Sequence, residues 1–384
     1  MNDARIMRTI VVGGGILGTT HAWQALKLGH DVIHVERDLL PRGASVRNFG
    51  LIWVSGRRAG LELNEAIRAR LMWEELSLEF PAMEFNPNGS LTLAKNEMEV
   101  ALLEECLTKV DANVRQWSVL DKRETQRVNP ALRGAYLAAL WCPLDATVEP
   151  ATVLTSLRTG LSKKAKYRWR SGVEIKSITP KAQYVQAISD SDEIFEGDLL
   201  ILCPGADHQT LFKDEFAAAP IRQVRLQMMS TDVFPEKLTT SIADGDSLRY
   251  YPAYAETNLA TLPIQAPIAS EKHMQLLLVQ RSDGTLTIGD THEYETPFEF
   301  TLDERPYEYL HEVASSLIGK RLPPIVRRWD GIYSQRIDGE IVDRRFIFPN
   351  VITVTGPGGR GNSLAPAIAE QTFDLIQRGS GDGI

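Results

Sequence analysis

Cysteine is scarce in this 384-residue chain, and the three cysteines present, Cys106, Cys142 and Cys203, lie far apart. They form no C-x-x-C pair and no set with metal-ligand spacing, so the sequence predicts neither a disulfide framework nor a metal site. This pattern is typical of a protein in a reducing compartment. No cysteine follows Cys203.

Long apolar runs and an excess of basic residues are also missing. No run approaches the ~18 apolar residues that a membrane span requires, and residues 1–8 lead into a strand without the pattern of a signal peptide. The net charge of −8 disfavours a nucleic-acid partner, because phosphate backbones require clustered Lys and Arg. Neither G-x-S-x-G nor H-E-x-x-H occurs, which excludes the common hydrolase motifs. We expect a soluble, cytoplasmic protein.

Residues 9–36 carry the most informative motif, a strand, a glycine loop, a helix and a second strand that ends in an acid. Gly13, Gly15 and Gly18 have the G-x-G-x-x-G spacing, which suits a tight turn, close approach of a pyrophosphate and close helix–strand packing. The helix N-terminus offers N–H groups to phosphates. Glu36 lies where a carboxylate can accept hydrogen bonds from a ribose. The motif predicts a dinucleotide site.

Residues 351–370 form a second strand, glycine loop and helix. Backbone N–H groups at such a helix start stabilise the negative charge that develops on a reduced flavin. A nicotinamide enzyme has no obvious need for this unit. The second loop therefore indicates a flavin, and a turn that serves only the fold is the alternative.

The remaining pattern predicts an α/β fold with two domains. Residues 198–203 are typical of a buried parallel strand, residues 220–295 are mostly strand-like, and the tail at residues 379–383 is expected to be loose. Helices are expected over residues 61–80, 97–110, 122–129, 305–317 and 363–378, with another beginning at Pro150. We expect a discontinuous Rossmann-type cofactor-binding domain from residues 1–85, 146–215 and 326–384, and a mixed, mainly antiparallel β-sheet substrate domain carrying helices from residues 86–145 and 216–325.

These motifs, together with residues 43–50 and 200–207, resemble the FAD-dependent D-amino acid, glycine and sarcosine oxidase superfamily over nearly the whole chain. Residues 280–294 and 328–333 are similar to a subgroup of flavoprotein oxidoreductases proposed to act on aminophosphonates. The resemblance implies that FAD is the cofactor. The residues that it places around FAD are Gly13, Gly14, Gly15, Ile16, Leu17, Gly18, Glu36, Arg37, Ser45, Arg47, Asn48, Val173, Cys203, Gly205, Gly359, Arg360, Gly361, Asn362, Ser363 and Leu364.

The chain departs from its resembled family at two positions. Some relatives attach flavin to a cysteine in the segment aligned with residues 329–333, where this chain has none, so we expect FAD to be bound non-covalently. Other relatives bind the substrate carboxylate through a Lys, where this chain has Ser363. The substrate's anion is therefore held differently, or it is not a carboxylate.

Oxidation of an amine requires orientation of the substrate over the flavin, so anion-binding and amine-binding side chains are the candidates. Arg360 and Arg47 lie in loops expected near the flavin and can bind a carboxylate or phosphonate. His292 follows a predicted strand and can hold an anion or assist deprotonation, and a surface position at the strand end is the alternative. Tyr251 is expected in a strand next to Tyr250, facing either the substrate or the sheet interior.

The sequence thus predicts FAD-dependent oxidation of a small anionic primary or secondary amine, with hydrolysis of the imine product. An aminophosphonate is the favoured substrate, and a D-amino acid, glycine or N-methyl amino acid is the alternative. The electron acceptor is O2 or a quinone or carrier protein. A non-catalytic flavoprotein that senses or organises partners is a further alternative. Oligomeric state has no signal in the sequence.

Overall fold

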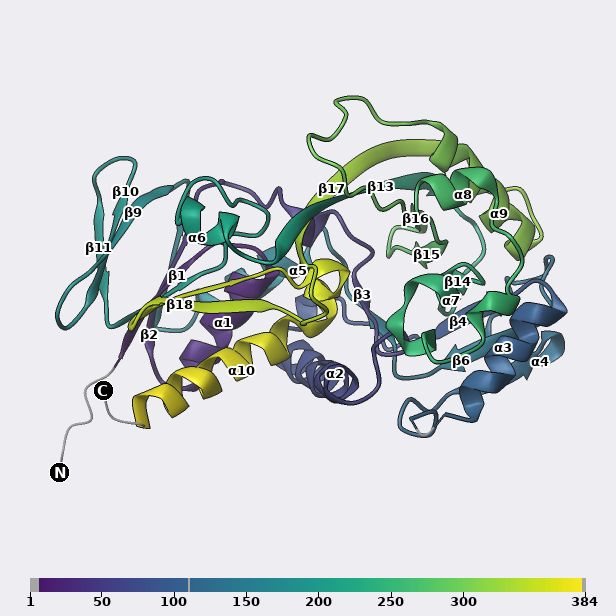
Figure 1. Cartoon of the computed structure of the whole chain (residues 1–384), viewed down its shortest axis with the longest axis horizontal. Coiled ribbons are helices and arrows are strands. Elements are labelled where there is room, and N and C mark those ends of the chain that lie inside the picture. The colour runs from purple at the N-terminus through teal and green to yellow at the C-terminus, as the bar shows by residue number, and fades with distance from the viewer. Residues whose placement is uncertain (1–6, 110, 382–384) are drawn as a thin grey trace.

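The computed structural model describes residues 7–109 and 111–381. Within these residues the longer strands belong mainly to two large sheets, which lie next to each other along the long axis of the molecule (Figure 1). One sheet has six strands and the other has eight.

The six-stranded sheet has the order β18-β19-β12-β1-β2-β8. Its strands are β1 (Arg8–Val12), β2 (Asp31–Glu36), β8 (Tyr167–Ser171), β12 (Leu199–Leu202), β18 (Asp343–Phe348) and β19 (Val351–Thr355). Neighbours are parallel except for the antiparallel β18 and β19. All four residues of β12 are buried, which confirms the strand expected near residues 198–203. Three distant parts of the chain contribute to this sheet.

Four helices accompany the six-stranded sheet: α1 (Ile16–Lys27), α2 (Leu61–Glu79), α5 (Val153–Leu161) and α10 (Gly361–Gly381). The last helix, α10, packs against both α1 and α2 (Figure 1). Gly29, with a φ of +83°, follows α1 and turns the chain into β2. At the far end of the molecule lies a three-stranded antiparallel sheet of β9 (Ile175–Pro180), β10 (Val185–Ser189) and β11 (Ile194–Gly197) (Figure 1).

The eight-stranded sheet has the order β17-β13-β16-β15-β14-β4-β6-β5. Its strands are β4 (Ser90–Ala94), β5 (Ser118–Asp121), β6 (Ala138–Cys142), β13 (Ile221–Val233), β14 (Ser241–Asp244), β15 (Leu277–Gln280), β16 (Thr285–Gly289) and β17 (Ile325–Arg336). Neighbours are antiparallel except for β14 and β4, which are parallel. The expected mixed, mainly antiparallel sheet is therefore confirmed.

Helices α3 (Glu97–Leu107), α4 (Lys122–Val128), α8 (Pro267–Glu271) and α9 (Arg305–Ile318) belong to the part of the molecule around the larger sheet (Figure 1). Shorter elements complete the described chain. They are β3 (Leu51–Ile52) paired with β7 (Ala146–Thr147), α6 (Lys213–Ala217), α7 (Ser247–Tyr250), and the 3-10 turns at Ala44–Val46, Pro81–Met83, Pro252–Tyr254, Leu259–Thr261 and Gly358–Arg360. No helix among the described residues is long and apolar enough to cross a membrane.

Three local expectations differ from the structure. Tyr250 ends the short helix α7 and Tyr251 follows it, so neither lies in a strand as predicted. The tail is not loose throughout residues 379–383, because α10 extends to Gly381, and residues 382–384 lie outside the described chain. The helix expected over 97–110 ends at Leu107, and Val110 is also outside the described residues.

The division into two domains stays a prediction. One observation bears on its boundary at residue 326. The strand β17, which the prediction assigns to the FAD-binding domain, pairs along nearly its whole length with β13 in the eight-stranded sheet.

Candidate active site

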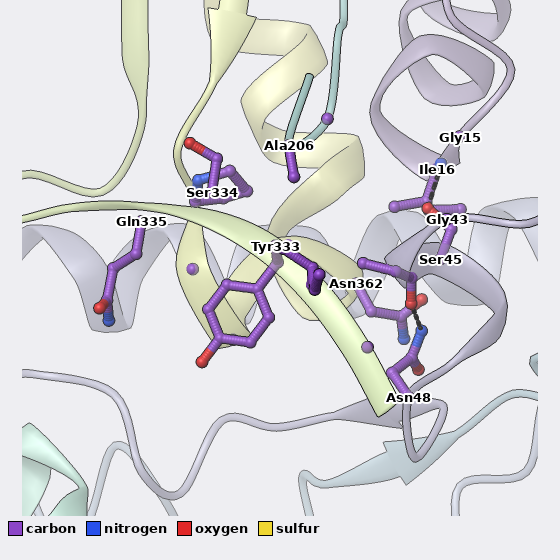
Figure 2. Close-up of a pocket in the computed structure, with 18 of the residues that line it drawn as sticks. Gly15, Ile16, Gly43, Ser45, Asn48, Ala206, Tyr333, Ser334, Gln335 and Asn362 are labelled. Carbon is purple, nitrogen blue, oxygen red and sulfur yellow. Dashed lines mark hydrogen bonds between the residues drawn. The ribbon is translucent and has the colours of Figure 1, made fainter. Parts of the chain in front are cut away.

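A large cavity connects the two glycine loops with the eight-stranded sheet. Its volume is about 1040 Å³, at the upper end of the roughly 300–1,000 Å³ typical of small-molecule sites. Figure 2 shows Tyr333, Ser334 and Gln335 of β17 on one side of this cavity and Gly15, Ile16, Gly43 and Ser45 on the other. This space accommodates a large cofactor together with a small substrate.

The N-terminal glycine loop has the geometry that its spacing predicts. Gly13 has a φ of +111°, and a Cβ there would lie 2.2 Å from the carbonyl oxygen of Cys203. A Cβ on Gly18 would lie 1.8 Å from the carbonyl oxygen of Gly13, so only glycine lets α1 pack this closely on the loop. At Gly15 a Cβ would meet only the Ser45 hydroxyl, at 3.1 Å, and this side of the loop faces the cavity.

Glu36 lies at the end of β2 beside this loop. Its Oε2 accepts a hydrogen bond from Gly14 N at 2.5 Å, and its Oε1 accepts one from Asp38 N at 2.9 Å. The carboxylate thereby fixes the chain on both sides of the expected ribose position. Nearby, Arg37 contacts Asp207 at 2.5 Å, and the Val173 N–H donates to the Glu36 carbonyl oxygen.

The loop at residues 43–50 crosses from the glycine loop to the larger sheet. Ser45 Oγ accepts from Ile16 N at 2.9 Å, and Asn48 Nδ2 donates to the Ala44 carbonyl at 2.9 Å (Figure 2). Arg47 is engaged by Asp330, with Nη1 3.5 Å from Oδ1 and 3.0 Å from the carbonyl oxygen. These bonds order the loop along the cavity wall.

The C-terminal glycine loop forms another wall. Gly359, Arg360, Gly361, Asn362 and Ser363 line the cavity, as do Cys203 and Gly205 beneath it. The hydroxyl of Ser363 accepts from Trp53 N at 2.8 Å and lies 3.1 Å from the Leu51 carbonyl, to which Asn362 Nδ2 also donates. Leu364 is fully buried in the apolar core and does not line the cavity.

Arg360 lines the cavity with its charge already paired. Its Nη1 lies 3.3 Å from Oε2 of Glu62, and its other nitrogens donate to the carbonyls of Pro357 and Glu340. Both arginines proposed from the sequence to bind the substrate's anion, Arg47 and Arg360, thus contact a carboxylate in this structure. Their role as anion ligands stays a prediction.

His292 is not a surface residue. Its side chain is 2% exposed and lines the cavity, and its Nδ1 lies 3.0 Å from the carbonyl of His273. The ring packs on Tyr250 with centroids 4.2 Å apart. Burial lowers the pKa of His292 to about 4, so the imidazole is neutral at pH 7. Tyr251 is buried next to Tyr250 and also lines the cavity.

Several cavity residues were missed by the sequence reasoning. Asp290 and Gln275 lie beside the cavity because β15 and β16 pair with Leu277 opposite Gly289. Tyr333 comes from β17. A Cβ on Gly359 would lie 3.8 Å from the hydroxyls of both Tyr250 and Tyr333, which places the two phenols next to the C-terminal loop.

Arg222 is another cavity residue that the sequence did not single out. Its Nε and Nη2 donate to Gln335 Oε1, at 3.1 and 2.9 Å, and its guanidinium lies 3.8 Å above the Tyr294 ring. Among the described residues the structure shows no carboxylate partner for Arg222. It is therefore a cation of the cavity wall whose charge is not neutralised by a neighbouring acid.

The residues present fit FAD. The two glycine loops offer N–H groups, the glycine positions leave no room for side chains, and Glu36 stands at the expected ribose. The family model described as DAO, FAD dependent oxidoreductase, matches residues 8–375. The chain belongs to this family. FAD is accordingly its cofactor, and non-covalent attachment stays a prediction.

Individual relatives share the architecture at low sequence identity. A protein of the opine oxidase of Rhizobium meliloti is 25% identical over 190 residues, which cover 45% of this chain and 49% of that protein. The matched segment thus spans about half of this relative. Glycine oxidase from Geobacillus kaustophilus has a TM-score of 0.76 and 19% identity, covering 97% of this chain and 95% of that one.

A third similar structure contains the cofactor. L-α-glycerophosphate oxidase from Mycoplasma pneumoniae, solved with FAD bound, has a TM-score of 0.73 and 17% identity, covering 97% of this chain and 95% of that one. The two structural likenesses show the fold of this DAO-family chain. Because the names of these proteins refer to donors as different as glycine and glycerophosphate, the donor has to be inferred from the cavity.

Proposed function

We propose that this DAO-family protein oxidises a small primary or secondary amine that carries an anionic group, with hydride transfer to FAD. The imine product hydrolyses to an aldehyde or keto compound and ammonia or a smaller amine. An aminophosphonate is the favoured substrate, supported by the motif resemblance at residues 280–294 and 328–333. A D-amino acid, glycine or sarcosine-type substrate is the alternative, supported by the names of the glycine oxidase and opine oxidase relatives.

The observation that carries the proposal is the unneutralised guanidinium of Arg222 in the cavity. A guanidinium binds the oxygens of a carboxylate or phosphonate through parallel hydrogen bonds. Tyr294 holds the guanidinium from one face. An anionic substrate would therefore be oriented by Arg222, with its reacting carbon toward the C-terminal glycine loop.

The other cavity residues suit the chemistry of an amine. Hydride leaves readily only from the carbon of a neutral amine, so the protein has to orient the substrate and exclude water. His292, Tyr250, Tyr251 and Tyr333 are uncharged at neutral pH, because burial lowers the pKa of the histidine and raises those of the three phenols. FAD, when bound, supplies the electron acceptor for the hydride.

The function is tested by an anaerobic panel of amines that includes aminophosphonates, D-amino acids, glycine and sarcosine, scored by bleaching of the flavin absorbance. Bleaching by an anionic amine supports the proposal, and ranks the two substrate classes. Absence of bleaching by every amine, with FAD bound, refutes it. Rapid reoxidation in air would identify O2 as the acceptor, and slow reoxidation a quinone or carrier protein.

The anion site is tested by Arg222→Gln, which removes the charge and keeps a polar side chain. Loss of a charge-assisted hydrogen bond costs about 1.5–3 kcal/mol, so we expect the KM for an anionic amine to rise about 10- to 100-fold while FAD remains bound. Arg47→Gln and Arg360→Gln are the matched comparisons, since both arginines line the cavity but contact carboxylates. If one of these variants raises KM and Arg222→Gln does not, the anion is bound there.

A further inference from the structure

Asp290 is an acid in an uncharged part of the cavity. Its side chain is 6% exposed, and its nearest charged or chargeable partner is His292, with Nε2 3.8 Å from Oδ2. Its Oδ1 is buried and has no hydrogen-bond partner among the described residues, and the same holds for Oε1 of Gln275. Unpaired buried acceptors are costly, so they mark a place where a ligand's donors are expected.

The surroundings of Asp290 come from four segments. Gln275 precedes β15 and exchanges backbone hydrogen bonds with Asp290. Tyr250 and Tyr251 come from the end of α7, His292 and Tyr294 from the segment after β16, and Tyr333 from β17; the phenols of all four tyrosines feel the charge of Asp290. None of these elements brings Lys or Arg into an ion pair with Asp290 within the described chain.

Tyr294 connects this acidic end of the cavity to Arg222. Burial raises the pKa of Tyr294, the charge of Asp290 adds to the rise, and Arg222 opposes it. The phenol therefore lies within electrostatic range of both groups. A cation at one end and an unpaired acid at the other match a small substrate that has an anionic group and an amino group.

Among these groups Asp290 has a titration near neutral pH. Burial raises the pKa of Asp290 to about 8, lowers that of His292 to about 4 and raises those of the four tyrosines above their ordinary values. Below pH 8 the carboxyl is mainly protonated and cannot accept a proton. Above pH 8 it is mainly ionised and becomes a base.

We propose that Asp290, supported by Gln275, binds the amino group of the substrate and accepts one of its protons; this inference rests on the proposed amine oxidation. An N–H bond of the ammonium breaks, an O–H bond forms on the carboxylate, and the electron pair of the broken bond stays on nitrogen. The C–H electron pair then leaves as hydride to FAD, and the nitrogen pair forms the C=N bond. The charge-neutral surroundings keep the carboxyl available for this exchange.

The test is the pH dependence of kcat/KM for flavin reduction, since this ratio reports groups of the free enzyme. For the wild-type holoenzyme we expect an ascending limb near pH 8, at the same pH for several amines whose own pKa values differ. In Asp290→Asn we expect kcat/KM at pH 8 to fall about 100-fold or more. Its remaining activity should rise only with the ionisation of each substrate's amine.

The matched control is Asp283→Asn, because Asp283 is an exposed aspartate in the turn between β15 and β16 and does not line the cavity. It should keep the limb near pH 8. FAD content and melting temperature are measured for both variants. If Asp290→Asn loses FAD or fails to fold, the wild-type profiles decide, because a limb that follows each substrate's own pKa overturns the proposal.

The outcome also separates this inference from the proposed function. If amines bleach the wild-type flavin but Asp290→Asn retains both the rate and the pH profile, the function stands and the role of Asp290 is wrong. If no amine bleaches the wild-type flavin at any pH, both fail.

Discussion

Glu36 holds two backbone N–H groups beside the first glycine loop, and we predict that Glu36→Gln weakens FAD binding. In the wild type each carboxylate oxygen accepts one bond, from Gly14 N and from Asp38 N. Glutamine has one oxygen and one NH2 group. Whichever way the amide lies, one of the two N–H groups faces another donor.

The size of the effect follows from this loss. Leaving one partly buried donor unpaired costs about 1–3 kcal/mol, and each 1.4 kcal/mol corresponds to about tenfold in affinity. We expect the Kd for FAD to rise about 5- to 140-fold. Where the ribose hydroxyls also bind Glu36, the variant should fall in the upper part of this range.

The assay is titration of the apoprotein with FAD, followed by quenching of flavin fluorescence. Glu174→Gln is the matched control, because Glu174 also lines the cavity but its side chain is 46% exposed and lies 3.9 Å from Arg37. Exposed ion pairs contribute little, so its effect should stay below about 1 kcal/mol. An unchanged Kd in Glu36→Gln would remove Glu36 from the cofactor site and refute the reasoning.

Three further predictions concern the cofactor and the frame of the site. FAD should be released completely into the supernatant on acid precipitation, and colour retained in the pellet would show covalent attachment. Gly18→Ala should lower the free energy of unfolding by about 1–3 kcal/mol, measured by urea denaturation, because its Cβ would collide with the Gly13 carbonyl; Gly43→Ala, with no atom within 4 Å, should change it little. Arg115→Met should cost about 3–5 kcal/mol in the same assay, because this fully buried guanidinium contacts Asp111 and the carbonyls of Val54, Ser55 and Arg57; a loss below about 1 kcal/mol would contradict its clamping role.

The elements read correctly from the sequence are those with a strong local pattern. The glycine spacing at residues 13–18 and the apolar run of β12 determine their own geometry, because a tight turn or a buried strand is encoded within a few neighbouring residues. Tyr250 and Tyr251 were misread for the same reason. Two tyrosines are typical of a strand, but the preceding residues form a single helical turn that ends before Pro252, and no longer periodicity marks so short a helix.

The substrate end of the cavity could not be read from the sequence, because its parts are brought together only by sheet register. Gln275 reaches Asp290 through the pairing of Leu277 with Gly289, and Arg222 reaches the β17 wall through its pairing with Gln335. Neither register has a local signal. The pairing of Arg47 with Asp330 and of Arg360 with Glu62 depends likewise on contacts between distant segments.

The order of strands in the six-stranded sheet has a consequence for biogenesis. The central strand β1 is made first, but its neighbour β12 follows almost two hundred residues later, and β19 and α10 come at the end of synthesis. During translation the first glycine loop therefore waits without its partners, and closing such long loops slows folding. We expect the nascent chain to acquire FAD only after release from the ribosome, so that a ribosome-bound chain stalled before residue 351 would not retain the cofactor.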